Sequence, residues 1–328
     1  MPWLISAAYS DPKMRILPLI LLALLGGTAE NVSSSLPGPF TRALENPLLT
    51  PQGQGWEALA VFNPAVIYAD GHYWMLYRAQ DPQGISRLGL ATSSDGLHFV
   101  RESQPVLSPS DPGEAGGVED PRLVRIGGRY YLTYTGYDGR RVAQTRLAVS
   151  EDLREWRKLG VIIDTPWNKA GAILDQPLDG LYFMYFGDRE IQLATSRDLR
   201  RWRVEPEAVL KPRPGMWDEG GVEPGPPPLL TPKGILLIYN GRDHRNVYAV
   251  GAALFSAGDP SQLLARSETP LLQAEAPYER EGTVPNVVFA EGLVVREGVW
   301  RLYYGGGDRV VGLATAKLAE LLEFAKSG

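Results

Sequence analysis

The sequence predicts an all-β fold, a five-bladed β-propeller, on the strength of three observations. A phrase made of a glycine and an aromatic-rich alternating strand occurs five times, at intervals of 52 to 64 residues. A second alternating strand follows each copy after a loop. Glycine and proline are abundant, at 36 and 27 residues, while the apolar fraction is an ordinary 44%, which indicates many turns in a globular protein. A β-sandwich, the alternative architecture, would not predict this period.

The five copies share a turn glycine followed by alternating apolar and polar residues, the pattern of a strand. They are GHYWMLYRA at Gly71, GRYYLTYTG at Gly128, GLYFMYFGD at Gly180, GILLIYNGR at Gly234 and GVWRLYYGG at Gly298. The strands that follow are RLGLATSSDG, RLAVSEDLREW, IQLATSRDLRRW, VGAALFSAGDP and VGLATAKLAELL. The strands that precede the glycines are NPAVIYA, EDPRLVRI, KAGAILDQ, EPGPPPLL and NVVFAEGLVV. Each repeat therefore contains about four strands, the content of one propeller blade.

The N-terminal region has the pattern of a secretory signal peptide. Lys13 and Arg15 precede an apolar run at residues 16–25, and small residues follow at 26–29. The run is short for a membrane span, so no span is expected after the signal is removed. Met14 is an alternative start of the chain. We therefore expect a secreted or periplasmic protein, or a cytoplasmic one if this run is instead a buried helix.

The predicted domain organisation follows from the repeats. Residues 1–29 form the signal peptide and residues 30–44 a linker. Residues 45–322 form the five-bladed catalytic propeller, and residues 323–328 a C-terminal tail. A short amphipathic helix is expected at residues 318–326, where it would close the last blade.

Composition excludes several classes of protein. The 33 Lys and Arg residues against 38 Asp and Glu give a net charge of −5, which argues against a nucleic-acid partner. The absence of cysteine excludes disulfides, thiol nucleophiles and zinc–thiolate sites. Three scattered histidines do not suggest a metal site. With no phosphate loop or dinucleotide turn either, we expect no cofactor and no metal.

Polar residues recur at the starts of the strands that precede the glycines. In a propeller these strands are innermost, so their first residues converge on the axis. They carry Asn63, Asp120 with Arg122, Lys169, Glu223, and Asn286 with Glu291. One such residue is best explained as a turn cap. Here polar residues begin five otherwise apolar strands at equivalent places. Burying polar groups costs free energy, so this recurrence favours a functional site.

Three longer motifs carry a specific resemblance. GVEDPRLV at residues 117–124, YEREGTVPNVVFAEGLV at 278–294 and LYYGGGDRVVGLATA at 302–316 resemble glycoside hydrolase family 130. The resemblance extends in order from Asn63 to Ala316. It implies a five-bladed propeller that acts on β-mannosides with inversion, either as a phosphorylase or as one of a smaller group of mannosidases.

The resemblance assigns the general acid to Asp120, in the EDPR motif. Cleavage of a glycosidic bond needs a proton for the leaving oxygen, and the resemblance implies that a mannose hydroxyl relays it. Arg122 would hold a nearby carboxylate or a sugar hydroxyl. Glu119 is an alternative acid.

The group that attacks the sugar separates two interpretations. A phosphorylase needs cations around phosphate, whereas an inverting hydrolase needs a carboxylate to activate water. Asp188, Glu223 and Glu291 stand where the resemblance implies basic, neutral or small residues in phosphorylases. The leading interpretation is therefore a β-mannosidase in which Glu223 and Glu291 activate water, with neither assigned as the base. Two close carboxylates would raise each other's pKa.

Phosphorolysis, releasing mannose 1-phosphate, is the runner-up. Lys169 and Arg146 match regions that the resemblance implies bind phosphate in phosphorylases. The partner is then an oligosaccharide with inorganic phosphate, of β-1,2 or β-1,4 linkage. Export favours hydrolysis, because phosphorolysis conserves energy only where the sugar phosphate stays in the cell. A propeller that binds glycans or a protein without catalysis is the rival from another class.

Substrate binding is expected from polar groups of the same channel. The candidates are Asn63, Arg78, Ser86, Arg87, Arg122, Lys169, Asp188, Asn286 and Asp308. Tyr137, Trp167 and Tyr248 offer planar surfaces to a sugar ring. For any one aromatic residue, packing in the core is the better interpretation.

Overall fold

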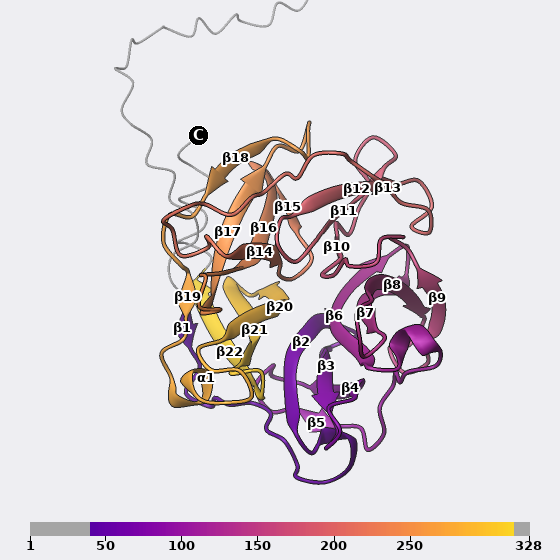
Figure 1. Cartoon of the computed structure of the whole chain (residues 1–328), viewed down its shortest axis with the longest axis vertical. Coiled ribbons are helices and arrows are strands. Elements are labelled where there is room, and N and C mark those ends of the chain that lie inside the picture. The colour runs from indigo at the N-terminus through magenta and orange to yellow at the C-terminus, as the bar shows by residue number, and fades with distance from the viewer. Residues whose placement is uncertain (1–39, 318–328) are drawn as a thin grey trace, which may run out of the picture. The chain divides into compact units, whose positions relative to one another are not determined.

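The computed structural model describes residues 40–317, and this part of the chain is built almost entirely of antiparallel strands (Figure 1). Two short 3₁₀ helices, Gly55–Glu57 and Pro112–Glu114, and one short helix, α1 (Pro277–Arg280), are the described helical elements. The all-β prediction is therefore confirmed. None of the described helices is long and apolar enough to cross a membrane. The predicted signal peptide, the helix at 318–326 and the tail lie outside the described residues.

The strands form antiparallel meanders that follow one another along the chain. The first consists of β2 (Ala60–Ala69), β3 (His72–Gln80), β4 (Ser86–Ser93) and β5 (Val100–Arg101). The second consists of β6 (Gly117–Ile126), β7 (Arg129–Tyr137), β8 (Ala143–Ser150) and β9 (Arg157–Val161). One parallel pair, Ser86 with Gly117, joins these two meanders into a single sheet.

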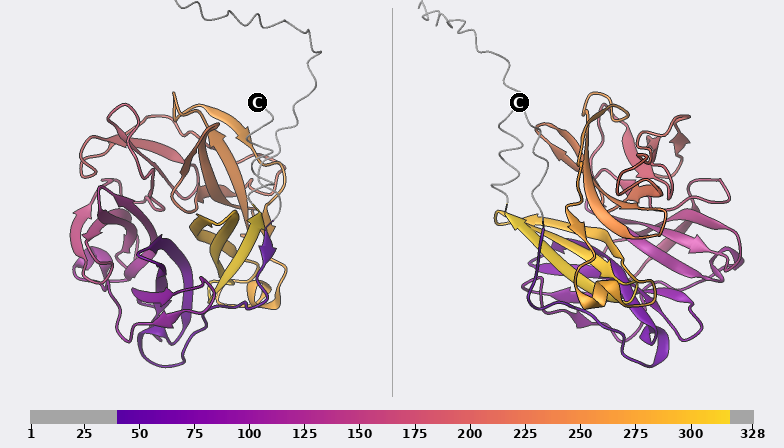
Figure 2. Two further views of the ribbon diagram at one scale, coloured as in Figure 1. Left: turned by 180° about the vertical axis from the view of Figure 1, so that it is seen from behind. Right: turned by 60° about the vertical axis from the view of Figure 1, so that its left-hand side comes forward.

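Three further meanders form separate sheets (Figure 2). The third meander is β10 (Ala172–Ile173), β11 (Tyr182–Phe186), β12 (Gln192–Ser196) and β13 (Arg203–Val204). The fourth is β14 (Gly221–Pro224), β15 (Leu229–Thr231), β16 (Gly234–Arg242), β17 (Tyr248–Phe255), β18 (Leu263–Arg266) and β19 (Leu272–Gln273). The fifth is β20 (Val288–Arg296), β21 (Val299–Gly306), β22 (Val310–Lys317) and β1 (Thr41–Arg42).

Strand β1 lies in the segment expected to be a linker. It pairs with β22, through Thr41 with Thr315 and Arg42 with Ala314. The preceding residue, Phe40, is buried in the core between the fourth and fifth meanders. The sheet therefore begins a few residues earlier than the repeats indicate, because β1 is too short to show an alternating pattern.

The repeated glycines stand at the tight turns that lead into the second strand of each meander. All five have φ between 73° and 138°, a region that other residues rarely adopt. At Gly71, Gly128, Gly180 and Gly298 a Cβ atom would meet nothing within 4 Å. Backbone conformation, and not lack of space, therefore explains why glycine recurs there.

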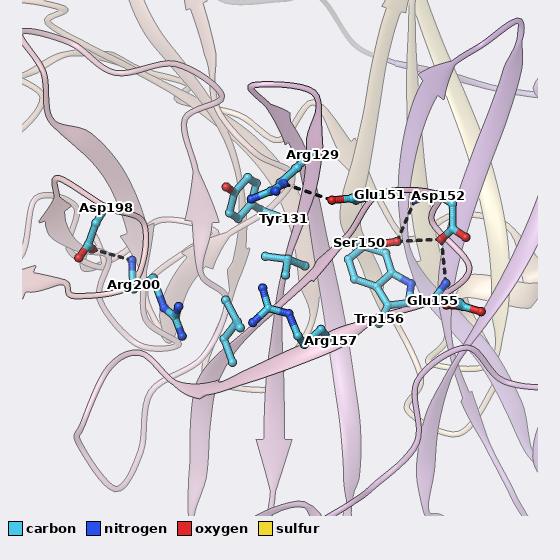
Figure 3. A pocket seen from close by; sticks show the side chains of 12 residues that line it. Arg129, Tyr131, Ser150, Glu151, Asp152, Glu155, Trp156, Arg157, Asp198 and Arg200 are labelled. Carbon is cyan, nitrogen blue, oxygen red and sulfur yellow. Dashed lines mark hydrogen bonds and ion pairs between the residues drawn. The ribbon is translucent and has the colours of Figure 1, made fainter.

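A surface cleft of about 770 Å³ lies where the second and third meanders meet solvent (Figure 3). Tyr131, Trp156 and three arginines, Arg129, Arg157 and Arg200, are among the residues that line it. Arg129 contacts Glu151 across 3.5 Å, and both side chains are mostly exposed. None of the residues predicted to form the functional site lines this cleft.

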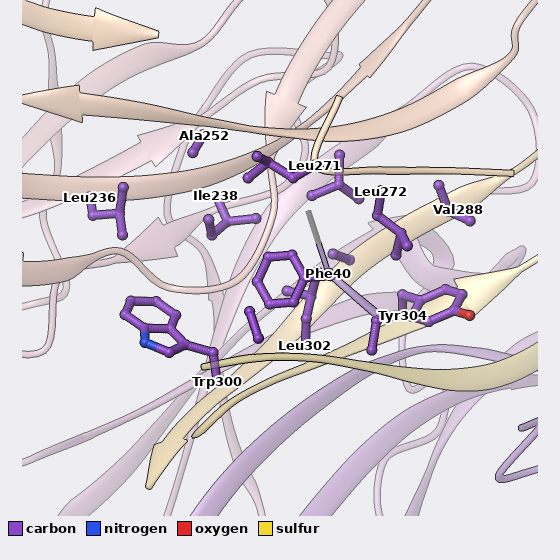
Figure 4. Packing of buried hydrophobic residues seen from close by; sticks show 14 of the residues in the cluster. Phe40, Leu236, Ile238, Ala252, Leu271, Leu272, Val288, Trp300, Leu302 and Tyr304 are labelled. Carbon is purple, nitrogen blue, oxygen red and sulfur yellow. The ribbon is translucent and has the colours of Figure 1, made fainter. Parts of the chain in front are cut away.

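The apolar core is divided into five clusters, and each packs two meanders together. Figure 4 shows the cluster in which Leu236 and Ile238 of the fourth meander meet Trp300, Leu302 and Tyr304 of the fifth. Another cluster joins the fifth meander to the first. Each meander thus has two neighbours, and the first strands β2, β6 and β20 lie near one another.

Candidate active site

The first strand of three meanders is distorted where a candidate residue stands. β-Bulges interrupt pairing around Asn63 in β2, Asp120 in β6 and Glu291 in β20. Asn63 and Asp120 have φ of 48° and 53°, a left-handed conformation that Asn and Asp tolerate best among residues with a side chain. A bulge redirects a side chain, so this local sequence turns three polar groups toward a shared region.

Asp120 lies in a dense hydrogen-bond network. Its Oδ1 accepts from Asn63 Nδ2 at 2.9 Å and from Arg78 at 3.0 Å. Arg78 also donates to Glu119 at 2.6 Å and to Ser86 Oγ at 2.9 Å, and its guanidinium lies over the Phe62 ring. The structure therefore brings together three candidates from the first meander with Glu119 and Asp120 from the second.

The adjacent carboxyl groups of Glu119 and Asp120 differ in how readily they ionise. Burial alone would raise the pKa of Asp120, but the charges of Arg78, Lys169 and Arg122 lower it to about 2. For Glu119 burial outweighs the attraction of Arg78, and Asp120 adds repulsion, so its pKa is raised. In the free site Asp120 is therefore ionised at neutral pH, and Glu119 is the group of the pair that holds a proton more readily.

Arg122 is buried beneath this network and ties two meanders together. It donates to the carbonyl oxygens of Asp120, Pro224 and Gly225 at 2.8 to 3.1 Å. Its guanidinium also lies 3.0 Å from Glu291, without the alignment of a hydrogen bond. Burial raises the pKa of Glu291 well above its ordinary value, despite the Arg122 charge. Arg122 thus contacts a carboxylate, the first of its two expected roles.

Glu223, Lys169, Asp188 and Asp308 complete the site. Burial raises the pKa of Glu223 to about 8, against the attraction of Lys169 and Arg122 and with added repulsion from Asp188 and Asp120. Burial likewise raises the pKa of Asp308 to about 6, where Arg78 is the strongest opposing charge. The charges of Asp120, Glu119 and Glu223 outweigh burial and raise the pKa of Lys169. Polar groups of all five meanders therefore interact in one place.

This arrangement can both position a sugar and move protons. Among residues 40–317, no group of three or more acidic or histidine side chains is placed to hold a metal ion. The family model for β-1,4-mannooligosaccharide phosphorylases of glycoside hydrolase family 130 matches residues 46–327. The chain belongs to glycoside hydrolase family 130.

The protein is similar to several family 130 members of named activity. It is 40% identical to a 1,2-β-oligomannan phosphorylase of Thermoanaerobacter sp. strain X514, over 85% of this chain and 98% of that protein. It is 36% identical to a β-1,2-mannobiose phosphorylase of the same organism, over 84% and 96%. A solved structure described for family 130 hydrolases that target β-1,2-mannosidic linkages in Candida mannan has a TM-score of 0.81 at 36% identity, over 85% and 94%.

Three of the expected family 130 residues make their hydrogen bonds outside the Asp120 network. Arg87 pairs with Asp81 at 2.7 Å beside the turn between β3 and β4. Asn286 has a φ of 61°, and its backbone carbonyl accepts from Tyr248. Arg146 donates to Asp111 at 2.6 Å and to the buried Glu114 at 3.1 Å. These two carboxylates hold its guanidinium, and its contact with phosphate stays a prediction.

Arg146 belongs to a kind of cluster that sequence reasoning missed. In four meanders a tyrosine hydroxyl and one or two cations hold a buried carboxylate in the loop before the first strand. The carboxylate and tyrosine pairs are Glu57 with Tyr77, Glu114 with Tyr134, Asp218 with Tyr239 and Glu279 with Tyr304. Pairs of an aromatic and an acidic residue, as at 56–57, 217–218 and 278–279, are the sequence signal. These acid–tyrosine clusters anchor the loops that lead to the family 130 site residues.

The raised pKa of Glu223 predicts a pH-dependent stability. Since the folded state binds this proton more tightly than the unfolded chain, its stabilisation is complete below about pH 4.5 and is lost as pH rises through about 8. We expect Glu223→Gln to melt several degrees higher than the parent protein near pH 9, and equally near pH 4. Thermal melts across this range measure it, with the exposed Glu207→Gln as control. Equal pH dependence of all three proteins would contradict the burial of an ionisable Glu223.

Proposed function

We propose that the protein is a five-bladed β-propeller enzyme that cleaves β-1,2-mannosides and transfers the mannosyl group to inorganic phosphate. Three relatives named as phosphorylases of β-1,2-mannan or β-1,2-mannobiose, at 32 to 40% identity, support phosphate as the acceptor and β-1,2 as the linkage. The five core clusters support the fold, because each joins two consecutive meanders and one joins the last to the first. In this proposal each meander is one blade.

The ammonium of Lys169, unpaired within the described part of the chain, is the observation that supports phosphate as the acceptor. Within residues 40–317 its ammonium forms no hydrogen bond or ion pair, and it lies 5.2 Å from the centroid of the Trp167 ring. The charges of Asp120, Glu119 and Glu223 nevertheless act on it strongly enough to raise its pKa. A cation beside the acid, with its donors available, suits a phosphate dianion. Arg78 and Arg122, in contrast, already donate to several acceptors.

The protonation of Glu223 and Glu291 decides how strongly the site repels a phosphate dianion. Glu223 and Glu291 are predicted from sequence to repel phosphate, which assumes that both are ionised. Burial raises the pKa of Glu223 to about 8 and that of Glu291 well above its usual range. Both carboxyl groups therefore hold a proton more readily than exposed glutamates do, which weakens their repulsion of phosphate, and Lys169 supplies positive charge.

The proposed reaction balances without a cofactor. Asp120, ionised in the free site, carries a proton once substrate and phosphate are bound. It passes this proton, through a mannose hydroxyl, to the glycosidic oxygen, and the bond from that oxygen to C1 breaks. An oxygen of hydrogen phosphate forms the new bond to C1 from the opposite face. The hydroxyl proton of the phosphate then restores the acid. The products are mannose 1-phosphate of inverted configuration and a mannoside shortened by one unit.

Hydrolysis is the second candidate, and one observation favours it. Glu223 and Glu291 are two buried carboxyl groups that interact with each other and with Asp120. Such a pair can take a proton from water opposite the acid once one member is ionised. The solved family 130 structure described for β-1,2-mannan hydrolases, at 36% identity, adds weight.

Product analysis with and without phosphate tests the proposal. With β-1,2-mannobiose, we expect mannose 1-phosphate that appears only when phosphate is present. Lys169→Ala is expected to raise the KM for phosphate about 10- to 100-fold, the value of a lost charge-assisted bond, and to change the KM for the sugar much less.

The control for this experiment is Lys211→Ala, because Lys211 is a half-exposed lysine in a weak surface ion pair. It should leave both constants unchanged. Free mannose formed at the same rate without phosphate would overturn phosphate transfer and favour hydrolysis. In that case Lys169→Ala would show no phosphate-dependent defect, and Glu223→Gln would be the variant that abolishes turnover.

A further inference from the structure

Trp167 is exposed in a protein that buries most of its large aromatic residues. Its exposed fraction is 47%, and among residues 40–317 no Phe, Tyr or other Trp is as exposed. Exposure of a large apolar ring costs free energy in water, so a fixed, exposed indole suggests a binding surface. Its position beside Lys169 raises the question of what it binds.

The backbone on both sides of Trp167 is firmly held. Ala143 donates to the Pro166 carbonyl at 3.1 Å, and Asn168 donates to the Ala143 carbonyl at 2.8 Å, so β8 brackets the tryptophan. The buried Asn168 side chain also accepts from the Thr145 backbone and donates to the Ile163 and Thr165 carbonyls. The tryptophan therefore stands on a rigid support.

The indole itself is held at one edge and one face. Its Nε1 donates to Asp188 Oδ2, and the Lys169 ammonium lies 5.2 Å from the ring. Both partners act electrostatically on Glu223, which places them at the border of the site. An aromatic ring whose orientation is already fixed loses little conformational entropy when a ligand stacks on it.

Solvent exposure increases from the buried pair of Arg122 and Glu291 to Trp167. Glu291 and Arg122 are 0% and 2% exposed, Asp120 is 9% exposed, and Trp167 reaches 47%. A mannosyl unit whose glycosidic oxygen meets the Asp120 region therefore has the rest of the oligosaccharide on the solvent side. Trp167 is the exposed aromatic residue that contacts the site residues Lys169 and Asp188.

We propose that Trp167 is the stacking platform for the sugar units beyond the cleaved bond, oriented by Asp188 and Lys169. A β-mannopyranoside presents the axial hydrogens of C1, C3 and C5 on one face, and this apolar face suits an indole. The platform rests on the proposed function, because it assumes a β-mannoside bound at Asp120. It makes Trp167 a determinant of preference for longer chains, a role separate from bond cleavage.

Binding measured without turnover tests the platform. In an Asp120→Asn background, isothermal titration with β-1,2-mannotriose and with mannose compares ligands that do and do not extend past the cleaved bond. Trp167→Ala should weaken mannotriose binding about tenfold, the value of a good ring stack, and leave mannose binding unchanged. Trp167→Phe should recover most of the affinity.

The matched control is Leu264→Ala, because Leu264 is equally exposed, at 49%, but lies on β18. It should leave both affinities unchanged. Unaltered mannotriose binding by Trp167→Ala, or an equal loss for mannose, would overturn the platform while leaving the proposed function standing. Failure of the Asp120→Asn protein to bind any β-mannoside would instead count against the proposed function itself.

Discussion

Replacing Asp120 with asparagine is expected to lower kcat/KM on β-1,2-mannobiose by about 10³-fold or more, the upper range for loss of a general acid. The substitution removes the carboxyl group from the centre of the site and keeps its size. Steady-state assays of sugar release, with and without phosphate, measure the loss. More than a tenth of the parent activity would contradict the role assigned to Asp120.

Glu119→Gln is the matched comparison, because it changes the adjacent carboxyl group on the same strand. Arg78 contacts both groups, while the pKa of Asp120 is lowered to about 2 and that of Glu119 is raised. We therefore expect Glu119 to hold a proton in the free site and Glu119→Gln to lower kcat by about 10- to 100-fold, less than Asp120→Asn. The reverse order would make Glu119 the acid.

Stability is expected to depend most strongly on Arg122. Arg122→Met leaves three backbone carbonyls without their donor and the buried Glu291 without its counter-charge. Removing one member of a buried pair costs about 3–5 kcal/mol, so the melting temperature should fall by on the order of 10 °C. Thermal and denaturant unfolding at neutral pH measure the effect.

A double-mutant cycle identifies the cause of this loss. Glu291→Gln alone should be nearly neutral or stabilising, since burial already favours its uncharged form. Added to Arg122→Met, it should recover part of the lost stability, because no unpaired carboxylate then remains. Strict additivity of the two changes would show that the lost backbone hydrogen bonds, and not the charge pair, account for the effect.

Much of the strand arrangement could be predicted from sequence because the repeat is carried by local rules. A turn glycine with positive φ and an alternating apolar pattern define each strand pair wherever they recur. The short strand β1 escaped prediction because two residues show no periodicity. Its partner, β22, lies at the opposite end of the described chain.

The candidate site could be predicted as a set of positions but not as a set of charges. Asn63 and Asp120 hydrogen-bond each other, and electrostatic interactions connect them with Lys169, Glu223 and Glu291, as the equivalent starts of the strands indicate. Protonation depends on burial and on neighbours from other repeats, which no single motif contains. That is why the sequence indicates Glu223 and Glu291 together and assigns neither as the base.

Arg146 shows that the partners of a basic residue are equally hard to predict from a motif. Its position in the second repeat matches a phosphate contact, yet Asp111 and Glu114 of the preceding loop hold it. A motif fixes where a residue stands along a strand, whereas its partner comes from whichever loop packs beside it. The aromatic and acidic pairs at 56–57, 217–218 and 278–279 indicate such partners in three other repeats, but Glu114 follows Gly113 and carries no such signal.

The pairing of β1 with β22 sets an order for folding during synthesis. The ribosome makes Thr41 and Arg42 early, whereas their partners Ala314 and Thr315 emerge after every other described strand has been made. The four earlier meanders can pair internally as they appear, but β1 has no sheet to join until the end. The last sheet can therefore be completed only after all the other described strands have been made, and until then the edge of β1 and the apolar Phe40 beside it are open to chaperones.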